Sequence, residues 1–236
     1  MDDRAEPAAA PGGFFALRTD PPGGGSHVPL AEVYTGRSAA LRARIDTVAA
    51  RLRTDERRVA ASLAYQGLAS RLWSVALAPA ALHGILPGLA PAVLRWDPAA
   101  AAPDDLWTEG PAAGEATVEG IREAVQYAHL APLAQAMRRE CRVSPRLLWG
   151  DAGSALAGAV RELDRWARVH GRPEAARRAR ELGAGLFAHP DLSDGTLNGT
   201  AFRRAGCCLY YRVPGGGLCG DCVFAAPGRS APSRKS

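Results

Sequence analysis

Residues 56–77, ERRVAASLAYQGLASRLWSVAL, contain the clearest structural pattern in this chain. Apolar side chains recur there every three to five residues, at Val59, Leu63, Leu68, Leu72 and Val75. This spacing places them on one face of an α-helix. Thr54 and Asp55 are candidate capping residues, and Pro79 should end the helix because proline cannot supply a helical N–H. The stretch therefore predicts one long amphipathic helix.

Helical patterns dominate the rest of the body as well. Further helices are predicted over residues 38–52, 117–141, 145–170 and 173–187. Ser144 and Pro145 supply an N-cap and a favoured first residue for the third of these, and Gly171 a C-terminal cap. Pro132 is a candidate kink in the second. The body is therefore expected to be a bundle of helices.

Only two short stretches have the pattern of β-strands, AVLRW at 92–96 and DLWTE at 105–109. They lie in a section broken by prolines and are expected to pair as a small hairpin. After the last predicted helix the chain becomes irregular. The predicted fold class is mainly α: a bundle-like helical body, a possible small β-hairpin and an irregular C-terminal loop that carries most of the cysteines.

Composition divides the 236 residues into four parts. Residues 1–30 are rich in Gly, Pro and Ala and are predicted to be a disordered or loosely docked tail, as are residues 226–236. Residues 31–200 form the helical body, and residues 201–225 form a C-terminal segment of their own. With 47% apolar and 22% charged residues, the chain has the composition of an ordinary globular protein.

The formal charge of +5 does not indicate a nucleic-acid partner. Lys235 is the only lysine, and the arginines are interleaved with Asp and Glu instead of forming a basic stripe. The N-terminal sequence MDDRAEPAAAPGG lacks the basic start and the apolar run of an export signal. A cytoplasmic location, where thiols stay reduced, is therefore expected.

Residues 72–94 carry no Asp, Glu, Lys or Arg and are long enough to span a bilayer core of about 30 Å. Pro79, Pro87 and Pro91 interrupt the stretch. Each proline costs about 3 kcal/mol in a helix interior. A buried helix end followed by an apolar turn region is favoured over a membrane span, and peripheral membrane contact stays open.

Four of the five cysteines gather in RRAGCCLYYRVPGGGLCGDCVF, residues 203–224. These four clustered cysteines are Cys207, Cys208, Cys219 and Cys222. The spacing is Cys-Cys-x10-Cys-x2-Cys, and Pro214 with the three glycines after it should turn the second pair back toward the first. Four converging thiolates are typical of an iron–sulfur cluster or of structural zinc.

The adjacent pair Cys207–Cys208 favours iron–sulfur over zinc. Four-cysteine zinc sites generally use two Cys-x2–4-Cys turns, each of which bends two ligands onto one ion. Neighbouring cysteines chelate a single ion with difficulty, whereas a two-iron cluster offers separate metal positions. Structural zinc and a disulfide or thiol relay stay open as alternatives.

The cysteine segment closely resembles the C-terminal signature of the FhuF-like ferric siderophore (ferric hydroxamate) reductases. The likeness lies in the four cysteines, the LYYR after the first pair and the CGDC turn. Residues 146–163, RLLWGDAGSALAGAVREL, look like the family's Trp-Gly-Asn helix with Asp151 in place of asparagine, and residues 58–72 also fit. The likeness spans about residues 35–225 and is highly specific only at the cysteine end.

This resemblance implies that all four clustered cysteines ligate a 2Fe–2S cluster. It implies one-electron reduction of Fe(III) bound to a siderophore, with release of Fe(II) in the cytoplasm and no catalytic residue beyond the cluster. Because the sequence shows no recognisable nicotinamide or flavin site and no P-loop motif, electrons would come from a separate donor, a ferredoxin or a flavoprotein reductase. The alternatives are an electron carrier or siderophore-binding module without turnover, and a zinc-stabilised interaction protein. No substrate-binding residue follows from the sequence.

Residues beside the cysteines are expected to tune or shield the cluster. Glycine N–H groups and the positive charge of Arg212 would favour its reduced form. Four apolar or aromatic neighbours would cover the cluster or simply pack, namely Leu209, Tyr210, Tyr211 and Phe224. Arg203 and Arg204 are candidates to attract an anionic siderophore or an acidic carrier, with a solvated surface as the alternative.

The remaining candidates have simpler interpretations. Cys141 is expected to be a free, partly buried thiol. Trp149 and Trp166 are expected to pack in the core, with Trp149 as a possible pocket residue. The five histidines are scattered and lack the spacing of metal ligands.

Overall fold

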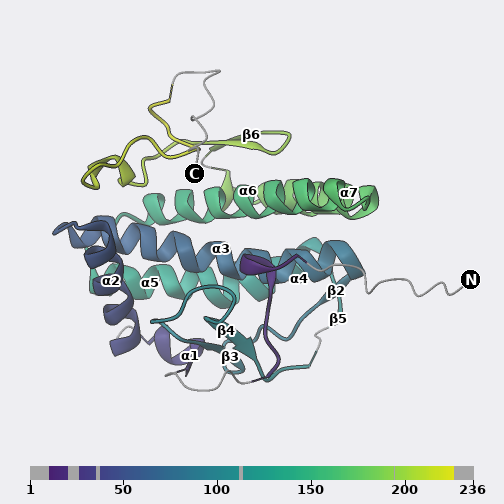
Figure 1. Ribbon diagram of the computed structural model, residues 1–236, viewed down its shortest axis with the longest axis horizontal. Coiled ribbons are helices and arrows are strands. Elements are labelled where there is room, and N and C mark those ends of the chain that lie inside the picture. The colour runs from purple at the N-terminus through teal and green to yellow at the C-terminus, as the bar shows by residue number, and fades with distance from the viewer. Residues whose placement is uncertain (1–10, 21–26, 36–37, 112–113, 194, 226–236) are drawn as a thin grey trace, which may run out of the picture.

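The computed structural model describes residues 11–20, 27–35, 38–111, 114–193 and 195–225, and it confirms the mainly α fold class. Helix α3 (Arg57–His83) runs through the centre of the molecule. Helices α6 (Pro145–Val169) and α7 (Pro173–Phe187) lie along one side of it, and α2 (Ala39–Leu52) crosses near its start (Figure 1). The C-terminal segment lies over the outer side of α6.

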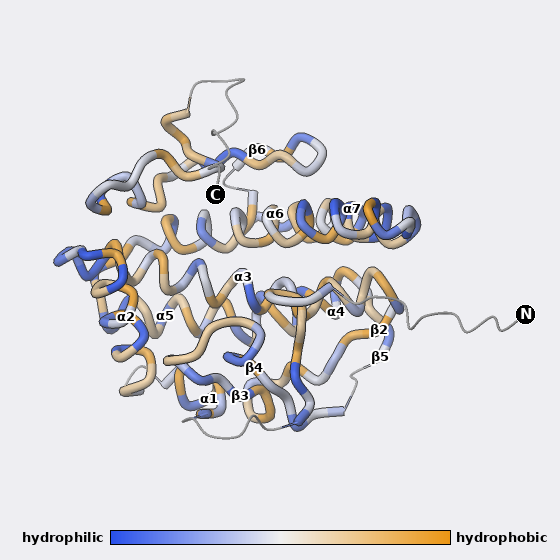
Figure 2. Tube along the Cα trace, in the orientation of Figure 1, coloured by the Kyte–Doolittle hydropathy of each residue, from blue (hydrophilic) through white to orange (hydrophobic). Residues whose placement is uncertain are grey.

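Helix α3 is buried around most of its circumference. Its alanines, among them Ala60, Ala69 and Ala76, are fully buried, and their small side chains let neighbouring helices approach closely. Trp73 is fully buried and donates its indole N–H to the carbonyl oxygen of Ala152 on α6 at 3.1 Å. The core is therefore centred on the contact between α3 and α6, and hydrophilic residues are frequent on the outer helices α2 and α7 (Figure 2).

The predicted end of this helix at Pro79 is wrong. Helix α3 continues through Pro79 to His83 and ends at Gly84, whose φ of 71° is the left-handed conformation that suits glycine. Burial of the surrounding turns, with Ala78 and Ala80 almost inaccessible, offsets the hydrogen bond that Pro79 cannot make.

The helix predicted over residues 117–141 is a continuous helical run of three parts. Helix α4 (Val118–Ile121) leads into the π-helical stretch η2 (Arg122–Leu130), which leads into α5 (Ala131–Glu140). Thr117 caps the run, since its hydroxyl accepts the N–H of Gly120 at 2.9 Å. The wider π turns come directly before Pro132, where an ordinary α-helical hydrogen bond is missing.

The predicted hairpin is confirmed. Strands β3 (Leu94–Trp96) and β4 (Leu106–Thr108) pair antiparallel, and β1 (Val28–Pro29) adds a third strand beside β3. The expectation that no other strands exist is wrong. Strand β2 (Ile85–Leu86) pairs with β5 (Gly114–Glu115), and β6 (Gly195–Asn198) pairs with β7 (Ala201–Arg204) directly before the cysteines.

Part of the predicted N-terminal tail is folded. The 3-10 turn η1 (Gly13–Phe15) lies on α3, where the buried Arg71 donates to the carbonyl oxygens of Phe14 and Ala16. Arg71 also pairs with Asp105 at 2.8 Å, so one buried guanidinium joins three segments. The disordered alternative is therefore wrong for the described residues 11–20 and 27–30, the last of which opens helix α1 (Leu30–Val33), and the docked alternative fits them.

The rest of the predicted tails, residues 1–10, 21–26 and 226–236, lies outside the described residues. The boundary predicted at residue 201 falls inside the β6–β7 hairpin. Among the described helices, none combines the length and apolar character needed to cross a membrane. Within residues 72–94 the helix ends at His83, and strands and turns follow, as the favoured interpretation of that stretch predicted.

Candidate metal centre

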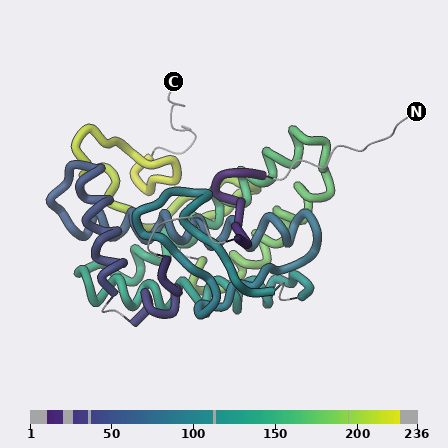
Figure 3. Tube along the Cα trace, turned by 60° about the horizontal axis from the view of Figure 1, so that its bottom comes forward, coloured from purple at the N-terminus to yellow at the C-terminus, as the bar shows by residue number. Residues whose placement is uncertain are grey.

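The hairpin β6–β7 leads from the helical body into the cysteine segment. Gly199 and Thr200 are the two central residues of the hairpin turn, with Gly199 at a φ of 61°. On β7, Phe202 is buried and stacks on Phe187 of α7 with ring centroids 5.3 Å apart. The segment then crosses to the start of α3, where Arg212 pairs with Glu56 at 2.7 Å (Figures 1 and 3).

The predicted chain reversal between the two cysteine pairs is confirmed. The short 3-10 turn η4 (Tyr210–Arg212) is followed by Gly215, whose φ is 67°. At Gly216 a Cβ would lie 2.7 Å from the carbonyl oxygen of Tyr210, so only glycine fits there. A second tight turn brings the N–H of Cys222 to the carbonyl oxygen of Cys219 at 3.1 Å.

A regular hydrogen-bond pattern surrounds the four sulfur atoms. Each sulfur accepts the backbone N–H of the residue two positions further along the chain. The N–H groups of Leu209 and Phe224 lie 3.2 and 3.4 Å from the sulfurs of Cys207 and Cys222. Those of Tyr210 and Asp221 donate to Cys208 and Cys219. Such donors stabilise negative charge on sulfur, as a thiolate ligand requires.

The prediction that glycines supply the N–H donors is wrong for these contacts. The donors are non-glycine residues because the position two residues after each cysteine faces back to its sulfur. After the first pair this requires Leu209 to adopt a φ of 67°, which is uncommon for a residue with a side chain. The backbone at Leu209 is thus held in an unfavourable conformation at the metal-binding segment.

The thiols of Cys208 and Cys219 are in contact. A hydrogen bond from Cys219 lowers the pKa of Cys208 to about 6, and the same bond raises the pKa of Cys219 well above its usual range. Without metal, the pair therefore shares one proton, with the negative charge on Cys208. Burial raises the pKa of Cys207, against the effect of the N–H of Leu209.

The donor set of the segment consists of four cysteine thiols, which suits a 2Fe–2S cluster. Cys208 and Cys222 are buried, and Cys207 and Cys219 are half-buried; all four are free of disulfides. Within the described part of the chain, no three His, Cys, Asp or Glu side chains are close enough to hold one metal ion. Four-cysteine zinc requires all sulfurs about 2.3 Å from one point. A 2Fe–2S cluster distributes four thiolates over two irons.

A buried ion pair lies directly beneath the cysteines. Arg204, the last residue of β7, contacts Asp151 of α6 at 2.5 Å, and both side chains are almost completely inaccessible. Ser62 of α3 lies 2.8 Å from Asp151 and 2.9 Å from the carbonyl oxygen of Cys208, so its hydroxyl is shared between them. Burial raises the pKa of Asp151 to about 7, although Arg204 and Ser62 act in the opposite direction.

A second anchor holds the CGDC turn. The backbone N–H of Arg204 donates to the carbonyl oxygen of Asp221 at 3.0 Å, which joins the two ends of the segment. The carboxylate of Asp221 accepts the hydroxyl of Ser154 on α6 and lies 3.7 Å from Arg161. Sequence reasoning missed Ser62, Ser154 and Asp221; a usable signal was their position as isolated polar residues in alanine-rich helices or between two cysteines.

The other candidate residues lie at different places. Cys141 is a free, buried thiol at the end of α5, as predicted. Trp149 and Trp166 pack against the core, and Trp166 stacks on His170. The guanidinium of Arg203 donates to the carbonyl oxygens of two residues after Cys222. His129 is buried between Tyr34 and the carbonyl oxygen of Leu89.

Three large apolar side chains surround the cysteines at the surface. This apolar rim consists of Tyr211, Leu218 and Phe224, which are 46%, 50% and 62% exposed. The rings of Tyr211 and Phe224 meet edge to face at 5.9 Å. Of the neighbours predicted to cover or pack, Leu209 and Tyr210 are half-buried, whereas the rim is open to solvent.

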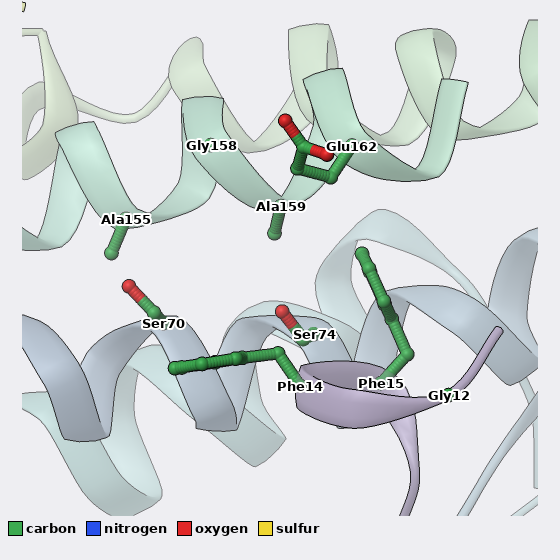
Figure 4. A pocket seen from close by; sticks show the side chains of 9 residues that line it. All are labelled: Gly12, Phe14, Phe15, Ser70, Ser74, Ala155, Gly158, Ala159 and Glu162. Atoms are coloured by element: carbon green, nitrogen blue, oxygen red, sulfur yellow. The ribbon is translucent and has the colours of Figure 1, made fainter. Parts of the chain in front are cut away.

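A cavity of about 390 Å³ lies between α3 and α6. Ala155 lines it, and the preceding residue Ser154 is the one that holds Asp221. In Figure 4 the ring of Phe14 extends toward Ser70, while Phe15 points toward α6. Its described lining also contains Ser74, Gly158 and Glu162 but no Arg or Lys.

A comparison with protein families finds a match at the cysteine segment. A model of the FhuF 2Fe–2S C-terminal domain matches residues 204–224, which contain Arg204 and all four clustered cysteines. No curated protein matches the chain. The match does not extend to residues 58–72 or 146–163, so their likeness to the family stays a prediction. The cofactor of the matched domain is a 2Fe–2S cluster, and the chain thus carries an FhuF-type 2Fe–2S domain at its C-terminal end.

Proposed function

We propose that this protein reduces Fe(III) bound to a siderophore by one electron and releases Fe(II) in the cytoplasm. The observation that carries the proposal is the match of the cysteine segment to the FhuF 2Fe–2S domain. The four clustered cysteines would ligate the cluster as thiolates, and the backbone N–H groups aimed at their sulfurs support this role. When bound, the cluster supplies the single electron that the reaction needs.

The chemistry of the substrate accounts for release after reduction. Siderophores bind iron through hard oxygen ligands, which hold Fe(III) much more strongly than Fe(II). One electron added to the bound Fe(III) therefore weakens the complex without breaking a covalent bond. No general acid or nucleophile is required, in agreement with a site whose conspicuous groups are thiols and a buried ion pair.

Electrons would enter from a separate protein donor, a ferredoxin or a flavoprotein reductase. Two of the four cysteines, Cys207 and Cys219, are partly exposed, and the apolar rim surrounds them. Exposed apolar patches of this kind commonly mark interaction surfaces. The rim is therefore the face on which we expect an electron donor to dock.

The ferric complex would bind in the cavity between α3 and α6. Ala155 of α6 lines the cavity, and the residue before it, Ser154, donates its hydroxyl to Asp221 of the cysteine segment. Phe14 and Phe15 offer apolar surface, Ser70 and Ser74 offer hydrogen bonds, and Glu162 is the one carboxylate in its described lining. An apolar lining without a cationic side chain favours a neutral or cationic hydroxamate complex over a highly anionic one.

Anaerobic purification followed by a stopped-flow experiment tests the proposal. The protein should be coloured and contain about two irons and two sulfides per chain. The chemically reduced protein should then be reoxidised by a ferric hydroxamate, with a rate that saturates as the substrate concentration rises, while a ferrous chelator captures the product. The corresponding gallium complex, which cannot be reduced in this way, is the matched control.

Other outcomes identify the alternative functions. Tight binding of the ferric complex without reoxidation would indicate a siderophore-binding module. Fast reoxidation by any soluble acceptor, without saturation, would indicate an electron carrier. A colourless protein with one zinc per chain would contradict the proposal and indicate a zinc-stabilised interaction protein.

A further inference from the structure

Arg204 has hydrogen-bond donors that the protein itself does not use. Its side chain is 2% exposed, and its Nη1 atom contacts Asp151 at 2.5 Å. Its Nε and Nη2 atoms are buried as well, yet neither has an acceptor among the described residues. Buried polar groups are nearly always paired in native proteins, and an unpaired one indicates a missing partner. The two free N–H groups therefore point to a group that the protein atoms alone do not provide.

The arrangement of these donors limits what the partner can be. Nε and Nη2 lie on the same edge of the planar guanidinium, so their N–H bonds run parallel like the two prongs of a fork. Such an edge suits a pair of neighbouring acceptors or one large, polarisable acceptor with negative charge. A single neutral carbonyl oxygen would satisfy only part of it.

Two contacts connect Arg204 to the cysteine segment. Its ion-pair partner Asp151 is linked through the hydroxyl of Ser62 to the carbonyl oxygen of Cys208. The backbone N–H of the same residue is bonded to the carbonyl oxygen of Asp221, between the last two cysteines. Arg204 thus lies under the metal-binding segment, with one side of its guanidinium on Asp151 and the other free.

We propose that the free edge of Arg204 donates hydrogen bonds to sulfur atoms of the 2Fe–2S cluster and that Arg204 thereby raises the reduction potential of the cluster. Hydrogen bonds to sulfur and a nearby positive charge both stabilise the electron-rich reduced state. Arg204 acts in this proposal as a positioning and tuning residue. The proposal rests on the 2Fe–2S domain and does not depend on the identity of the substrate.

Asp151 and Ser62 have the complementary role of holding the guanidinium. Asp151 is fully buried and carries a charge opposite to that of Arg204, and Ser62 ties Asp151 to the carbonyl oxygen of Cys208. Asp151 fixes the direction of the free edge and also places a negative charge near the cluster. Changes at the two residues should therefore move the reduction potential in opposite directions, downward for Arg204→Gln and upward for Asp151→Asn.

Pulsed EPR on the reduced wild-type protein tests the contact directly. The protein is labelled with arginine that carries 15N only in its guanidinium group. The expected result is a 15N coupling to the cluster electron that is absent from Arg204→Lys and present in Arg212→Gln. Arg212→Gln is the control, because it removes an exposed arginine of the same segment that forms an ion pair with Glu56. A wild-type protein without 15N coupling overturns the proposal, and so does a coupling that survives in Arg204→Lys.

A redox titration followed by EPR supplies the second readout. The midpoint potential should fall in Arg204→Gln, fall less in Arg204→Lys because the charge remains, and change least in Arg212→Gln. Equal shifts in Arg204→Gln and Arg212→Gln overturn the proposal, since they would reflect general charge alone. If the Arg204 variants fail to assemble the cluster, the labelled wild type is compared with Arg212→Gln and Arg203→Lys instead. Loss of the 15N coupling in either of these two variants overturns the proposal. A 15N coupling that both variants retain supports it.

Discussion

The helical body and the cysteine segment are stabilised in different ways. In the body, α3 and α6 bury large apolar side chains such as Leu72, Trp73 and Leu156 completely. In the segment, Leu218 and Phe224 are at least half exposed, and the backbone is held by turns and by a few polar contacts to α3 and α6. We therefore expect the body to fold on apolar burial alone, whereas the segment, which has little apolar burial, needs its metal to be stable.

Replacement of Cys208 by serine should give the largest effect. We expect nearly complete loss of iron, of sulfide and of the visible absorption, because a buried thiol that is proposed to ligate the cluster is removed. The far-UV circular dichroism should keep almost all of its helical signal. The control is Cys141→Ser, which replaces a buried thiol at the C-terminal end of α5, outside residues 203–224, and should retain the cluster. Joint loss of colour and helix in Cys208→Ser would break the distinction between the two regions.

Leu72→Ala should instead lower the unfolding free energy of the helical body. Leu72 is fully buried in α3, and loss of such a side chain costs about 2–5 kcal/mol of unfolding free energy through lost burial and a cavity. Leu218→Ala, in the half-exposed rim, should change the unfolding free energy by about 0.5 kcal/mol or less. Urea unfolding of the two variants, followed by circular dichroism, measures both values. Similar losses in the two variants would show that the segment contributes to the core after all.

The buried, hydrogen-bonded side chain of His129 should make the stability of the helical body depend on pH. His129 accepts a hydrogen bond from Tyr34 at Nδ1 and donates from Nε2 to the carbonyl oxygen of Leu89, so its ring is neutral. Burial lowers the pKa of His129 to about 4, below its usual value of about 6.5. The unfolded chain therefore binds the proton more readily between pH 4 and 6.5. Stability should fall as the pH falls through this range, by up to roughly 3 kcal/mol.

The measurement is the difference in unfolding free energy between wild type and His129→Gln at several pH values. The difference is needed because Asp151, whose pKa burial raises to about 7, contributes the opposite slope. The folded protein holds that proton more tightly than the unfolded chain, so its share of the stability falls as the pH rises from about 4 to 7. Both proteins contain Asp151, and its share cancels. A pH-independent difference would contradict a buried neutral His129.

Sequence patterns predicted most elements that local signals define. Helix α6 begins at Pro145 and is followed by Gly171 at a φ of 64°, as the cap residues indicated. The β6–β7 hairpin was missed although Asn198–Gly199 is a strong turn signal. The predicted end at Pro79 failed because burial, which depends on the tertiary structure, outweighed the local preference.

The candidate metal centre also has one part that the sequence predicts and one part that it does not. The two cysteine pairs, the reversing loop and the cofactor follow from a contiguous stretch of 22 residues, 203–224. The support beneath them joins Ser62, Asp151 and Arg204, which lie far apart in the sequence and meet only because α3 packs against α6. No local pattern encodes that meeting. The docking of Phe14 on α3 is of the same kind, because it depends on the distant Arg71.

The smallest expected effect concerns the cavity between α3 and α6 in the body. Gly158 lines it, and a Cβ there would meet only the end of the Arg161 side chain, at 3.9 Å. Gly158→Leu should therefore fill the cavity without disturbing the core, and it should stabilise α6 slightly, because leucine favours a helix by about 0.5–1 kcal/mol relative to glycine.

With the cavity as the binding site of the ferric complex, Gly158→Leu should raise the KM for a ferric hydroxamate up to about tenfold, equivalent to about 1.4 kcal/mol. The cluster spectrum and midpoint potential should stay unchanged. Gly158→Ala, which adds one methyl group, should have a smaller effect on KM and a similar gain in stability. An unchanged KM in Gly158→Leu would place substrate binding at the exposed rim, and the cysteine segment would then provide both the electron and the contact with the ferric complex.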